Sequence, residues 1–429
     1  SAAKEAFIAW AATDLNERIT LLDRLLDIYN SRADEMAQAI SNEMGAPIAL
    51  ARKAQVAAGA THLKNTIYAA KSFAFERPLG DHAPGVMIFY EPVGVCALIT
   101  PWNWPMNQVM LKVAPALATG CTVILKPSEL SPLSSMLLAE MIDEAGFKPG
   151  VFNLVNGDGA GVGKYLTVHP EVHMVSFTGS TRAGIAISKA AADTVKRVSL
   201  ELGGKGANII FADANEKAVT HGVRHCFNNS GQSCNAPTRM LVERLIYKQS
   251  IEMARSVAEK TEVGPANLDG RHIGPVASET QFKKIQSLIE SGLDEGAKLI
   301  SGGLGRPEGL QRGHYVRPTI FANVTPKMTI WTEEIFGPVL CITPFDSEDE
   351  AITLANDTPY GLANYVQTLN KERARRVSRQ LRSGMVEMNS KFRGAGSPFG
   401  GMKQSGNGRE GGAWGLEEFL EVKAVSDWR

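Results

Sequence analysis

The segment around Cys234 has the composition of a loop that presents a thiol. Asparagine, serine, glycine and glutamine fill positions 228 to 233, and Pro237 follows shortly after. A partly open, polar setting of this kind favours the thiolate, which is the nucleophilic form of cysteine. Glu201 stands where a β-branched run meets two glycines, so its carboxylate is a candidate general base. A soft nucleophile and a base together predict covalent catalysis.

A thiolate that attacks a carbonyl creates an oxyanion, which needs aimed hydrogen-bond donors. Asn103 is a candidate donor, because Trp102, Trp104 and Pro105 flank it and would hold its amide rigid. The backbone N–H of Cys234 is the natural second donor. Without the cysteine, ordinary aromatic packing would be the preferred explanation of the Trp-Asn-Trp triplet.

Two predicted strand ends carry the residues of a nucleotide site. Phe177-Thr178-Gly179-Ser180 joins a predicted strand to a predicted helix, and the free backbone N–H groups at that helix start suit a pyrophosphate. Taken alone, a turn of this kind is more often plain punctuation between a strand and a helix than a nucleotide site.

Lys126-Pro127-Ser128-Glu129 follows another strand of the same predicted sheet, and ligands bind at such carboxyl ends. Glu129 can accept both ribose hydroxyls and would repel a 2′-phosphate, while Lys126 can donate to the same sugar. NAD is therefore favoured over NADP, although Ser128 could tolerate the phosphate. The plain alternative is a surface Lys-Glu pair at a helix start.

These groups need a scaffold, and short β-rich runs that alternate with helical patterns after Gly94 indicate parallel α/β architecture. The predicted strands are 93–100, 121–125, 151–155, 173–177 and 197–200, and the predicted helices are 104–119, 131–146, 159–168 and 180–194. A second alternation after Cys234 places strands near 239–242, 298–300, 339–343, 365–368 and 384–388. We therefore expect two α/β lobes.

Three segments lie outside this alternation. Apolar residues at helical spacing predict an amphipathic helix within 16–44, ended by Gly45-Ala46-Pro47. The stretch 73–91 has no helical period, and 420–425 alternates like a strand. Neither of the last two fits the core of a lobe.

The bulk properties limit the class of protein. A chain of 429 residues exceeds what one hydrophobic core usually supports, so two or three domains are expected. Its 45 basic and 45 acidic residues cancel, which argues against nucleic acid or an anionic membrane as partner and favours a small ligand. Five cysteines without Cys-x-x-Cys spacing fit a reducing cytoplasm. The sequence contains no apolar run of the roughly 18 residues that a membrane span requires, and its first residues lack the layout of a secretory signal.

Seven segments in order resemble the pattern of the aldehyde dehydrogenase superfamily, nearly from end to end. They are Thr100-Pro101-Trp102-Asn103-Trp104-Pro105, Lys126-Pro127-Ser128-Glu129, Phe177-Thr178-Gly179-Ser180, Glu201-Leu202-Gly203-Gly204-Lys205, the Cys234 loop, Glu333-Glu334-Ile335-Phe336-Gly337-Pro338, and Pro398-Phe399-Gly400-Gly401 leading to Gly408-Arg409-Glu410. The resemblance implies NAD(P)-dependent oxidation of an aldehyde to a carboxylic acid, through a thiohemiacetal and a thioester on Cys234. Glu201 would then activate the water that cleaves the thioester.

The resemblance also implies two doubly wound-like α/β lobes and a small antiparallel oligomerisation sheet. The expected NAD-binding domain is 1–72 with 93–203, the catalytic domain is 204–404, and the oligomerisation segments are 73–92 and 419–429. A homodimer or homotetramer is expected. Family members have about one more hairpin before Ala6, so the chain is expected to be shortened at its front.

Further site residues follow from the resemblance. Lys112 and Glu410 would form a proton path behind Glu201. The implied cofactor residues are Thr100, Pro101, Trp102, Lys126, Ser128, Glu129, Phe177, Thr178, Gly179, Ser180, Leu202, Gly203, Glu334 and Phe336. The implied substrate-lining residues are Trp104, Asn107, Gln108, Ser233, Asn235, Phe392, Arg393 and Phe399. Arg393 is expected to favour aldehydes with a distal carboxylate or polar group.

Three other functions remain open at this stage. A related enzyme could pass the acyl group to coenzyme A, although thiolysis does not need the base that Glu201 provides. A cysteine hydrolase needs a histidine beside the thiol, and only His272 and His314 follow Cys234. A non-catalytic scaffold that keeps the fold is the third alternative.

Two patterns are rejected as sites. Gly406-Asn407-Gly408-Arg409-Glu410-Gly411 satisfies G-x-G-x-x-G, but too few residues follow it for a βαβ unit. The pairs His169/His173 and His221/His225 have the helical spacing of metal ligands but lack the Glu of the H-E-x-x-H pattern. No metal is expected.

Overall fold

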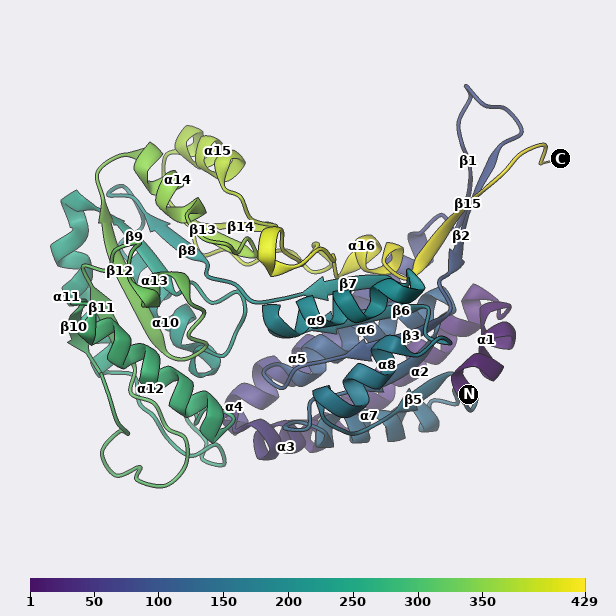
Figure 1. The fold of residues 1–429 in the computed structure, drawn as a ribbon, viewed down its shortest axis with the longest axis horizontal. Coiled ribbons are helices and arrows are strands. Elements are labelled where there is room, and N and C mark those ends of the chain that lie inside the picture. Colours follow the sequence, from purple (N-terminus) through teal and green to yellow (C-terminus); the bar gives the residue numbers. More distant parts are fainter. Residues whose placement is uncertain (429) are drawn as a thin grey trace.

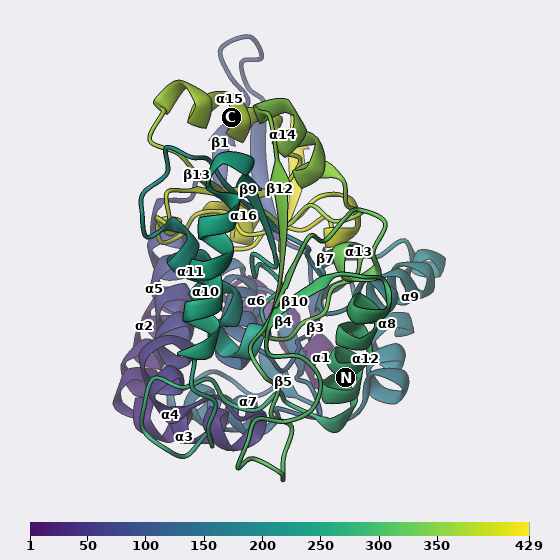
Figure 2. The same cartoon turned by 90° about the vertical axis from the view of Figure 1, so that its left-hand side faces the viewer.

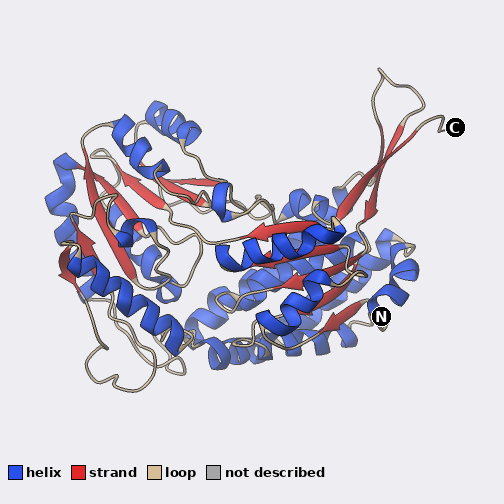
Figure 3. Cartoon of the chain, viewed as in Figure 1, coloured by secondary structure: helices blue, strands red, loops and turns tan. Residues whose placement is uncertain are grey.

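A computed structural model describes residues 1–428, and its three β-sheets mark two lobes and a projecting arm (Figure 1, Figure 3). The sheet of the first lobe has the order β5-β4-β3-β6-β7 and is parallel throughout. Its strands are β3 Val95–Ile99, β4 Thr122–Lys126, β5 Phe152–Leu154, β6 Met174–Thr178 and β7 Arg197–Glu201. All five strands were predicted within a few residues. The order reverses between β3 and β6, which is where open α/β sheets bind ligands at their carboxyl ends.

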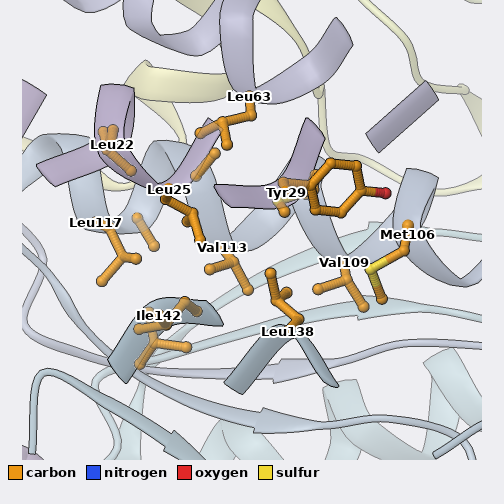
Figure 4. Packing of buried hydrophobic residues seen from close by; sticks show 14 of the residues in the cluster. Leu22, Leu25, Tyr29, Leu63, Met106, Val109, Val113, Leu117, Leu138 and Ile142 are labelled. Carbon is orange, nitrogen blue, oxygen red and sulfur yellow. The ribbon is translucent and has the colours of Figure 1, made fainter. Parts of the chain in front are cut away.

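Helices cover both faces of this sheet. They are α1 Ala2–Ala11, α2 Leu15–Ser31, α3 Ala33–Met44, α4 Ile48–Leu50, α5 Val56–Ser72, α6 Pro105–Thr119, α7 Leu133–Glu144, α8 Lys164–Val168 and α9 Thr181–Ala191, with π-helical turns at Ala51–Gln55 and Gly159–Gly163 and a 3₁₀ turn at Ala192–Thr194. Helix α6 is buried on nearly every side, which explains why its sequence is apolar around its whole circumference. In Figure 4, Val109, Val113 and Leu117 of α6 lie between Leu22, Leu25 and Leu63 on one side and Leu138 and Ile142 on the other.

The prediction of one helix over 16–44 was wrong, because α2 and α3 are separate helices divided at Arg32. Arg32 leaves the helical region with φ −103° and ψ 21°. Its guanidinium binds Glu35 and Glu140, which holds this corner against α7. The apolar spacing continues across the break because both helices bury one face in the same core. The predicted end is confirmed, since Gly45 closes α3 in the left-handed region at φ 79°.

The second lobe has a seven-stranded sheet of order β10-β11-β12-β9-β8-β13-β14, in which only the β10–β11 pair is antiparallel. Its strands are β8 Ala207–Ile210, β9 Arg239–Glu243, β10 Lys298–Ser301, β11 Thr319–Ala322, β12 Val339–Phe345, β13 Ala363–Gln367 and β14 Met385–Met388. Its helices are α10 Ala218–Phe227, α11 Tyr247–Glu259, α12 Glu279–Asp294, α13 Thr329–Thr332, α14 Glu348–Asn356 and α15 Lys371–Gln380. Strands β8 and β11 were missed, because four fully buried residues show no alternation that marks a strand.

The third sheet forms the arm that projects from the first lobe (Figure 1, Figure 2). It is antiparallel, in the order β1-β2-β15, with β1 Glu76–Pro78, β2 Met87–Pro92 and β15 Leu420–Val425. The predicted strand at 420–425 is confirmed. Helix α16 Gly412–Glu417 precedes β15, and Leu416 and Leu420 are buried in the core of the first lobe. The C-terminal segment therefore ties the arm to that lobe.

Candidate active site

The loop that carries Cys234 leaves α10 through a strained turn. Asn229 and Ser230 both lie in the left-handed region, at φ 52° and 57°, and Gly231 follows at φ 73°. A Cβ at position 231 would lie 2.0 Å from the carbonyl oxygen of Gly337, so only glycine fits this crossing. The strained turn and the close crossing fix the path of the loop, and Cys234 is partly exposed at its end.

The polar side chains of this loop do not activate the thiol, contrary to the prediction from composition. Asn229 Nδ2 donates to the carbonyl of Asn103, Ser230 Oγ donates to the carbonyl of Gly274, and Gln232 Oε1 accepts from the backbone N–H of Ala277. Burial instead raises the pKa of the Cys234 thiol, and the carboxylates of Glu334, Glu201 and Glu410 raise it further. Asn229, Ser230 and Gln232 therefore serve the loop's shape, because each bonds a backbone group.

The Asn103 side chain is locked to the cysteine loop. Its Nδ2 donates to the carbonyl oxygen of Gln232 at 3.0 Å, two residues before Cys234. The backbone carbonyl of Asn103 accepts from Asn229 Nδ2 at 2.8 Å and from Gln55 Nε2 at 3.2 Å. A carboxamide nitrogen carries two hydrogens, so one of them remains for a ligand. Asn103 and Cys234 line the same cavity, as the oxyanion hypothesis requires.

Glu201 ends β7 and is almost fully buried, with 2% of its surface exposed. Neither of its carboxylate oxygens has a hydrogen-bond partner among residues 1–428. Burial raises its pKa well above the ordinary value, Glu410 raises it further, and Lys112 lowers it. A carboxyl with a raised pKa and free oxygens has the properties of a general base poised to take a proton from water.

The rejected G-x-G-x-x-G segment forms the wall beside Glu201. Gly406 pairs with Glu201 as an isolated antiparallel bridge, and a Cβ at 406 would lie 2.0 Å from the Leu200 carbonyl oxygen. A Cβ at Gly400 would lie 2.6 Å from Glu201 Oε1. Gly400 and Gly406 approach β7 and its terminal carboxylate so closely that no side chain would fit at either position.

Behind Glu201 lies a buried ion pair that the resemblance implied. Lys112 Nζ lies 2.5 Å from Glu410 Oε1 and donates to Ser176 Oγ at 3.1 Å. The side chains of Lys112 and Glu410 are 1% and 5% exposed. Because both charges influence the pKa of Glu201, the pair is coupled electrostatically to the candidate base.

The residues implied for a dinucleotide fit that group. The carboxyl ends of β3 and β6 lead directly into Thr100 and Thr178, whose buried hydroxyl oxygens have no partner in the described part of the chain. Ser180 caps α9 by accepting from the Ala183 N–H, as expected for a helix start that faces a phosphate. Lys126 is buried and pairs with the half-exposed Glu129 at 3.6 Å, while Ser128 accepts from Leu130.

A cavity of about 190 Å³ joins these strand ends to the thiol. Its lining is Pro101, Trp102, Asn103, Gln108, Thr178, Gly179, Ser180, Leu202, Gly203, Cys234, Gln281, Lys284, Glu334 and Phe336. Trp102 meets Phe336 edge to face at 5.6 Å, and Glu334 accepts from the backbone N–H of Gly204 at 2.9 Å. Phe177 lies under Gly179, where an added Cβ would lie 2.4 Å from its ring. Asn103 and Cys234 thus share one cavity with predicted cofactor residues, whereas Glu201 is not among the residues that line it.

The predicted substrate residues fall into two groups. Trp104 Nε1 donates to Ser233 Oγ at 2.8 Å, and the Asn235 carbonyl accepts from Tyr365 at 2.6 Å, so both flank the cysteine. Asn107 Oδ1 lies 2.8 Å from His62 Nε2. Gln108 alone of these residues lines the catalytic cavity.

The second group lies in the loop after β14. Arg393 bonds Glu387 at 3.1 Å and the Pro398 carbonyl at 3.3 Å, and its guanidinium stacks over Phe399. A substrate carboxylate would have to compete with Glu387 for this arginine. Phe392 is exposed and lines a different cavity, with His225 and Tyr365.

Sequence reasoning missed four residues of the site. Gln55, fully buried at the end of a π-helical turn, joins Asn103 to Asn229, and His62 fixes Asn107. Gln281 Nε2 donates to the backbone carbonyls of Ile335 and Phe336, and Lys284 Nζ donates to the backbone carbonyl of Glu334. The sequence shows that Gln281 and Lys284 are three residues apart and so share one face of a helix, but it contains no signal that this face lines a cavity.

Residues 1–428 show neither a membrane-spanning helix nor a cluster of metal-ligating side chains. No helix there is long and apolar enough to cross a membrane. In the same range, no group of three or more His, Cys, Asp and Glu side chains is arranged to hold a metal ion. Of the histidines considered as ligands, His173 accepts from the Val95 N–H and His169 accepts from the Glu171 N–H.

Comparison with known proteins identifies the family. Residues 1–425 match the model of the aldehyde dehydrogenase family. The chain belongs to the aldehyde dehydrogenase family. A 3-succinoylsemialdehyde-pyridine dehydrogenase from a Pseudomonas species is 54% identical over 426 residues, which cover 99% of this chain and 88% of that protein.

Solved structures of aldehyde dehydrogenases have the same fold as this chain. One from Bartonella henselae has a TM-score of 0.98 and 59% identity, covering 99% of this chain and 89% of that one. A cysteine-to-alanine variant of aldehyde dehydrogenase C from Pseudomonas syringae, solved with NAD⁺ and octanal, has a TM-score of 0.98 and 48% identity and covers 100% of this chain and 88% of that one. The predicted α/β fold with a small antiparallel sheet is confirmed.

Proposed function

We propose that this aldehyde dehydrogenase oxidises an aldehyde with NAD and releases the free carboxylic acid, with Cys234 as nucleophile. The observation that carries the proposal is that Cys234 and Asn103 line one cavity with Gly179, Gly203 and Glu334. A structural neighbour binds NAD⁺ and octanal together, which supports a cofactor and an aldehyde in one site.

In the first half-reaction, the partly exposed Cys234 thiol loses its proton to solvent, and the thiolate attacks the aldehyde carbon to form a thiohemiacetal with the negative charge on its oxygen. The free hydrogen on Asn103 Nδ2 and the backbone N–H of Cys234 would stabilise the oxyanion. The bond from Nδ2 to the Gln232 carbonyl orients the Asn103 amide, and the bonds from Gln55 and Asn229 hold the backbone carbonyl of Asn103. NAD, when bound, supplies a hydride acceptor, and loss of hydride converts the thiohemiacetal to a thioester.

In the second half-reaction, Glu201 takes a proton from the water that cleaves the thioester. Its raised pKa makes it a stronger base than an exposed glutamate. The Lys112–Glu410 pair would carry the proton onward, because Glu410 Oε2 has no partner within the described chain and both charges of the pair influence the pKa of Glu201.

We further propose that the cofactor contacts are made at the strand ends. Lys126, Ser128 and Glu129 would bind the adenosine ribose, with Glu129 favouring NAD over NADP. The remaining contacts would come from Thr100, Pro101, Trp102, Phe177, Thr178, Gly179, Ser180, Leu202, Gly203, Glu334 and Phe336.

The arm is proposed to join subunits in a homodimer or homotetramer. All of β1 and four consecutive residues of β15 are exposed, and β15 lies at an edge of the sheet. We also propose the division into an NAD-binding domain, a catalytic domain and two arm segments, because each of these parts has its own β-sheet.

The decisive experiment is a rapid-mixing measurement of NADH formation by Glu201→Gln. The variant should release a burst of NADH close to one per active site and then almost stop, because the thioester forms but is not hydrolysed. Glu259→Gln, which alters an exposed helix residue, is the control and should turn over normally. A full steady-state rate in Glu201→Gln, or an obligatory coenzyme A requirement in the parent enzyme, would refute the hydrolytic mechanism.

A further inference from the structure

The route proposed for the hydrolytic proton ends at groups that have almost no contact with solvent. Glu201 is 2% exposed, and the side chains of Lys112 and Glu410 behind it are 1% and 5% exposed. Each turnover loads one more proton onto this buried cluster, so the proton must leave before the base can activate the next water. A further ionisable group that reaches the surface is therefore needed next to the cluster.

One face of β7 leads from Glu201 toward the surface. Side chains alternate along a strand, so Arg197, Ser199 and Glu201 share this face. Ser199 is 4% exposed, whereas the Arg197 side chain is 33% exposed. A Cβ at Gly408 would lie 2.3 Å from Ser199 Oγ and 3.3 Å from Glu201 Oε1. Because residue 408 has no side chain, both oxygens approach the same point next to its backbone.

Glu418 meets this face of β7 at the C-terminal end of α16. Arg197 Nη1 donates to the backbone carbonyl of Glu418 at 2.9 Å, and Glu418 Oε1 accepts from the backbone N–H of Arg409 at 2.8 Å. The Ser199 hydroxyl bonds the same carboxylate. Arg409 directly precedes Glu410 in the chain, and part of the Glu418 surface is exposed. Glu418 therefore lies between the buried cluster and solvent.

The surroundings of Glu418 suit a group that takes up and releases a proton. Burial raises the pKa of its carboxyl above the ordinary value, and the charge of Glu410 raises it further. Three neighbouring groups lower this pKa: the N–H of Arg409, the hydroxyl of Ser199 and the guanidinium of Arg197. Glu418 in turn raises the pKa of Glu201. A carboxyl with a raised pKa exchanges protons closer to neutral pH than an exposed glutamate does.

We propose that Glu418 is the exit for the proton that Glu201 takes from the hydrolytic water, with Ser199 as the bridge. The inference rests on the proposed function, since a hydrolytic mechanism is what loads this proton. The Glu201 carboxyl gives its proton to the Ser199 oxygen while the Ser199 hydroxyl gives its own proton to Glu418, which then releases one to solvent. One proton enters the path and one leaves it, so the three groups return to their starting state. Glu418 does not line the catalytic cavity and acts through Glu201.

Glu418→Gln tests the exit, because the amide keeps an oxygen for the Arg409 N–H but cannot exchange a proton in this way. The NADH burst should keep the size and rate of the parent enzyme, since the first half-reaction does not use Glu201. The steady-state kcat should fall at least about tenfold in dilute buffer, with the KM for NAD unchanged. Imidazole, a small buffer that carries protons itself, should restore most of the loss. Glu417→Gln, at an exposed neighbour on α16, is the matched control and should keep the parent's kcat.

Substitutions at Ser199 test the bridge. Ser199→Ala should show the same buffer-dependent loss of kcat with an intact NADH burst. Ser199→Thr, which keeps a hydroxyl, should recover most of what Ser199→Ala loses. A packing defect at position 199 would not follow the presence of the hydroxyl or the concentration of imidazole.

Three results would overturn the proposal. One is a Glu418→Gln variant that keeps the parent's kcat in dilute buffer. Another is a loss of kcat that imidazole leaves unchanged, and the third is a burst that falls together with kcat, since both indicate a purely structural role. If Glu201→Gln turns over at the full rate, the proposed function fails as well, and that result is obtained on a different variant.

Discussion

Substitution of Lys112 by methionine tests the buried charge network most directly. Lys112 and Glu410 are 1% and 5% exposed and lie 2.5 Å apart, and Glu201 stands beside them with both oxygens free of partners among the described residues. Methionine fills a similar volume but removes the only side-chain cation that the structure places on Glu410 within residues 1–428.

The expected cost follows from leaving a carboxylate buried without its cation. Breaking a buried pair in this way lowers the free energy of unfolding by about 3–5 kcal/mol. Replacing both charges is far less costly, so Lys112→Met combined with Glu410→Gln should recover more than half of the loss. The double variant also serves as the control for a simple packing defect at position 112.

The same variants move the pKa of Glu201 in opposite directions. Lys112 lowers that pKa and Glu410 raises it. Because a general base must be deprotonated, the acidic limb of the kcat profile should shift to higher pH in Lys112→Met and to lower pH in Glu410→Gln.

The assay is urea unfolding followed by tryptophan fluorescence at one fixed protein concentration, since association stabilises the folded state. The pH profile of kcat is measured on the same preparations. A loss below about 1 kcal/mol in Lys112→Met, a double variant no more stable than Lys112→Met, or pH limbs that move together would refute the reasoning.

Three further substitutions are expected to act as follows. Gly406→Ala should lower the free energy of unfolding in urea by about 2–4 kcal/mol, because φ is 113° and the new Cβ would meet the Leu200 carbonyl. The control is Gly309→Ala, at φ 77° with open space around the new Cβ, and it should lower the free energy of unfolding by only about 1 kcal/mol. Burial lowers the pKa of His225 from 6.5 to about 4, so the folded protein favours the neutral imidazole. The free energy of unfolding should therefore fall by about 3 kcal/mol as the pH drops from about 6.5 to about 4, because the unfolded chain binds the proton first. His225→Gln should flatten this decline in unfolding curves taken across the range, and an unchanged slope would contradict the assignment. Glu129→Ala should raise kcat/KM for NADP relative to NAD by about tenfold or more, and identical cofactor ratios before and after the change would remove Glu129 from the ribose site.

Local patterns were sufficient where structure depends on near neighbours in the chain. The alternation of strands and helices predicted the five strands of the first sheet, and the period of two at 420–425 predicted β15. Patterning failed where neighbours share one environment: α2 and α3 keep a continuous apolar stripe across Arg32, and β8 and β11 are buried on both faces. A hydrophobic pattern predicts which side of a helix or strand is buried. It does not predict a bend between two helices that bury the same side, or a strand that is buried on both faces.

The sequence by itself determined the candidate chemistry at Cys234, Glu201 and Asn103, because residue type and motif order carry that information. Only the tertiary structure decided which polar groups are free to act. Asn229, Ser230 and Gln232 look like activators of the thiol in the sequence, yet they are bonded to backbone groups, and Arg393 is held by Glu387. Gln108 keeps an unbonded oxygen among residues 1–428. The physical reason is that a hydrogen-bonding group is available only after every closer partner in the folded chain has been counted, and those partners come from distant parts of the sequence.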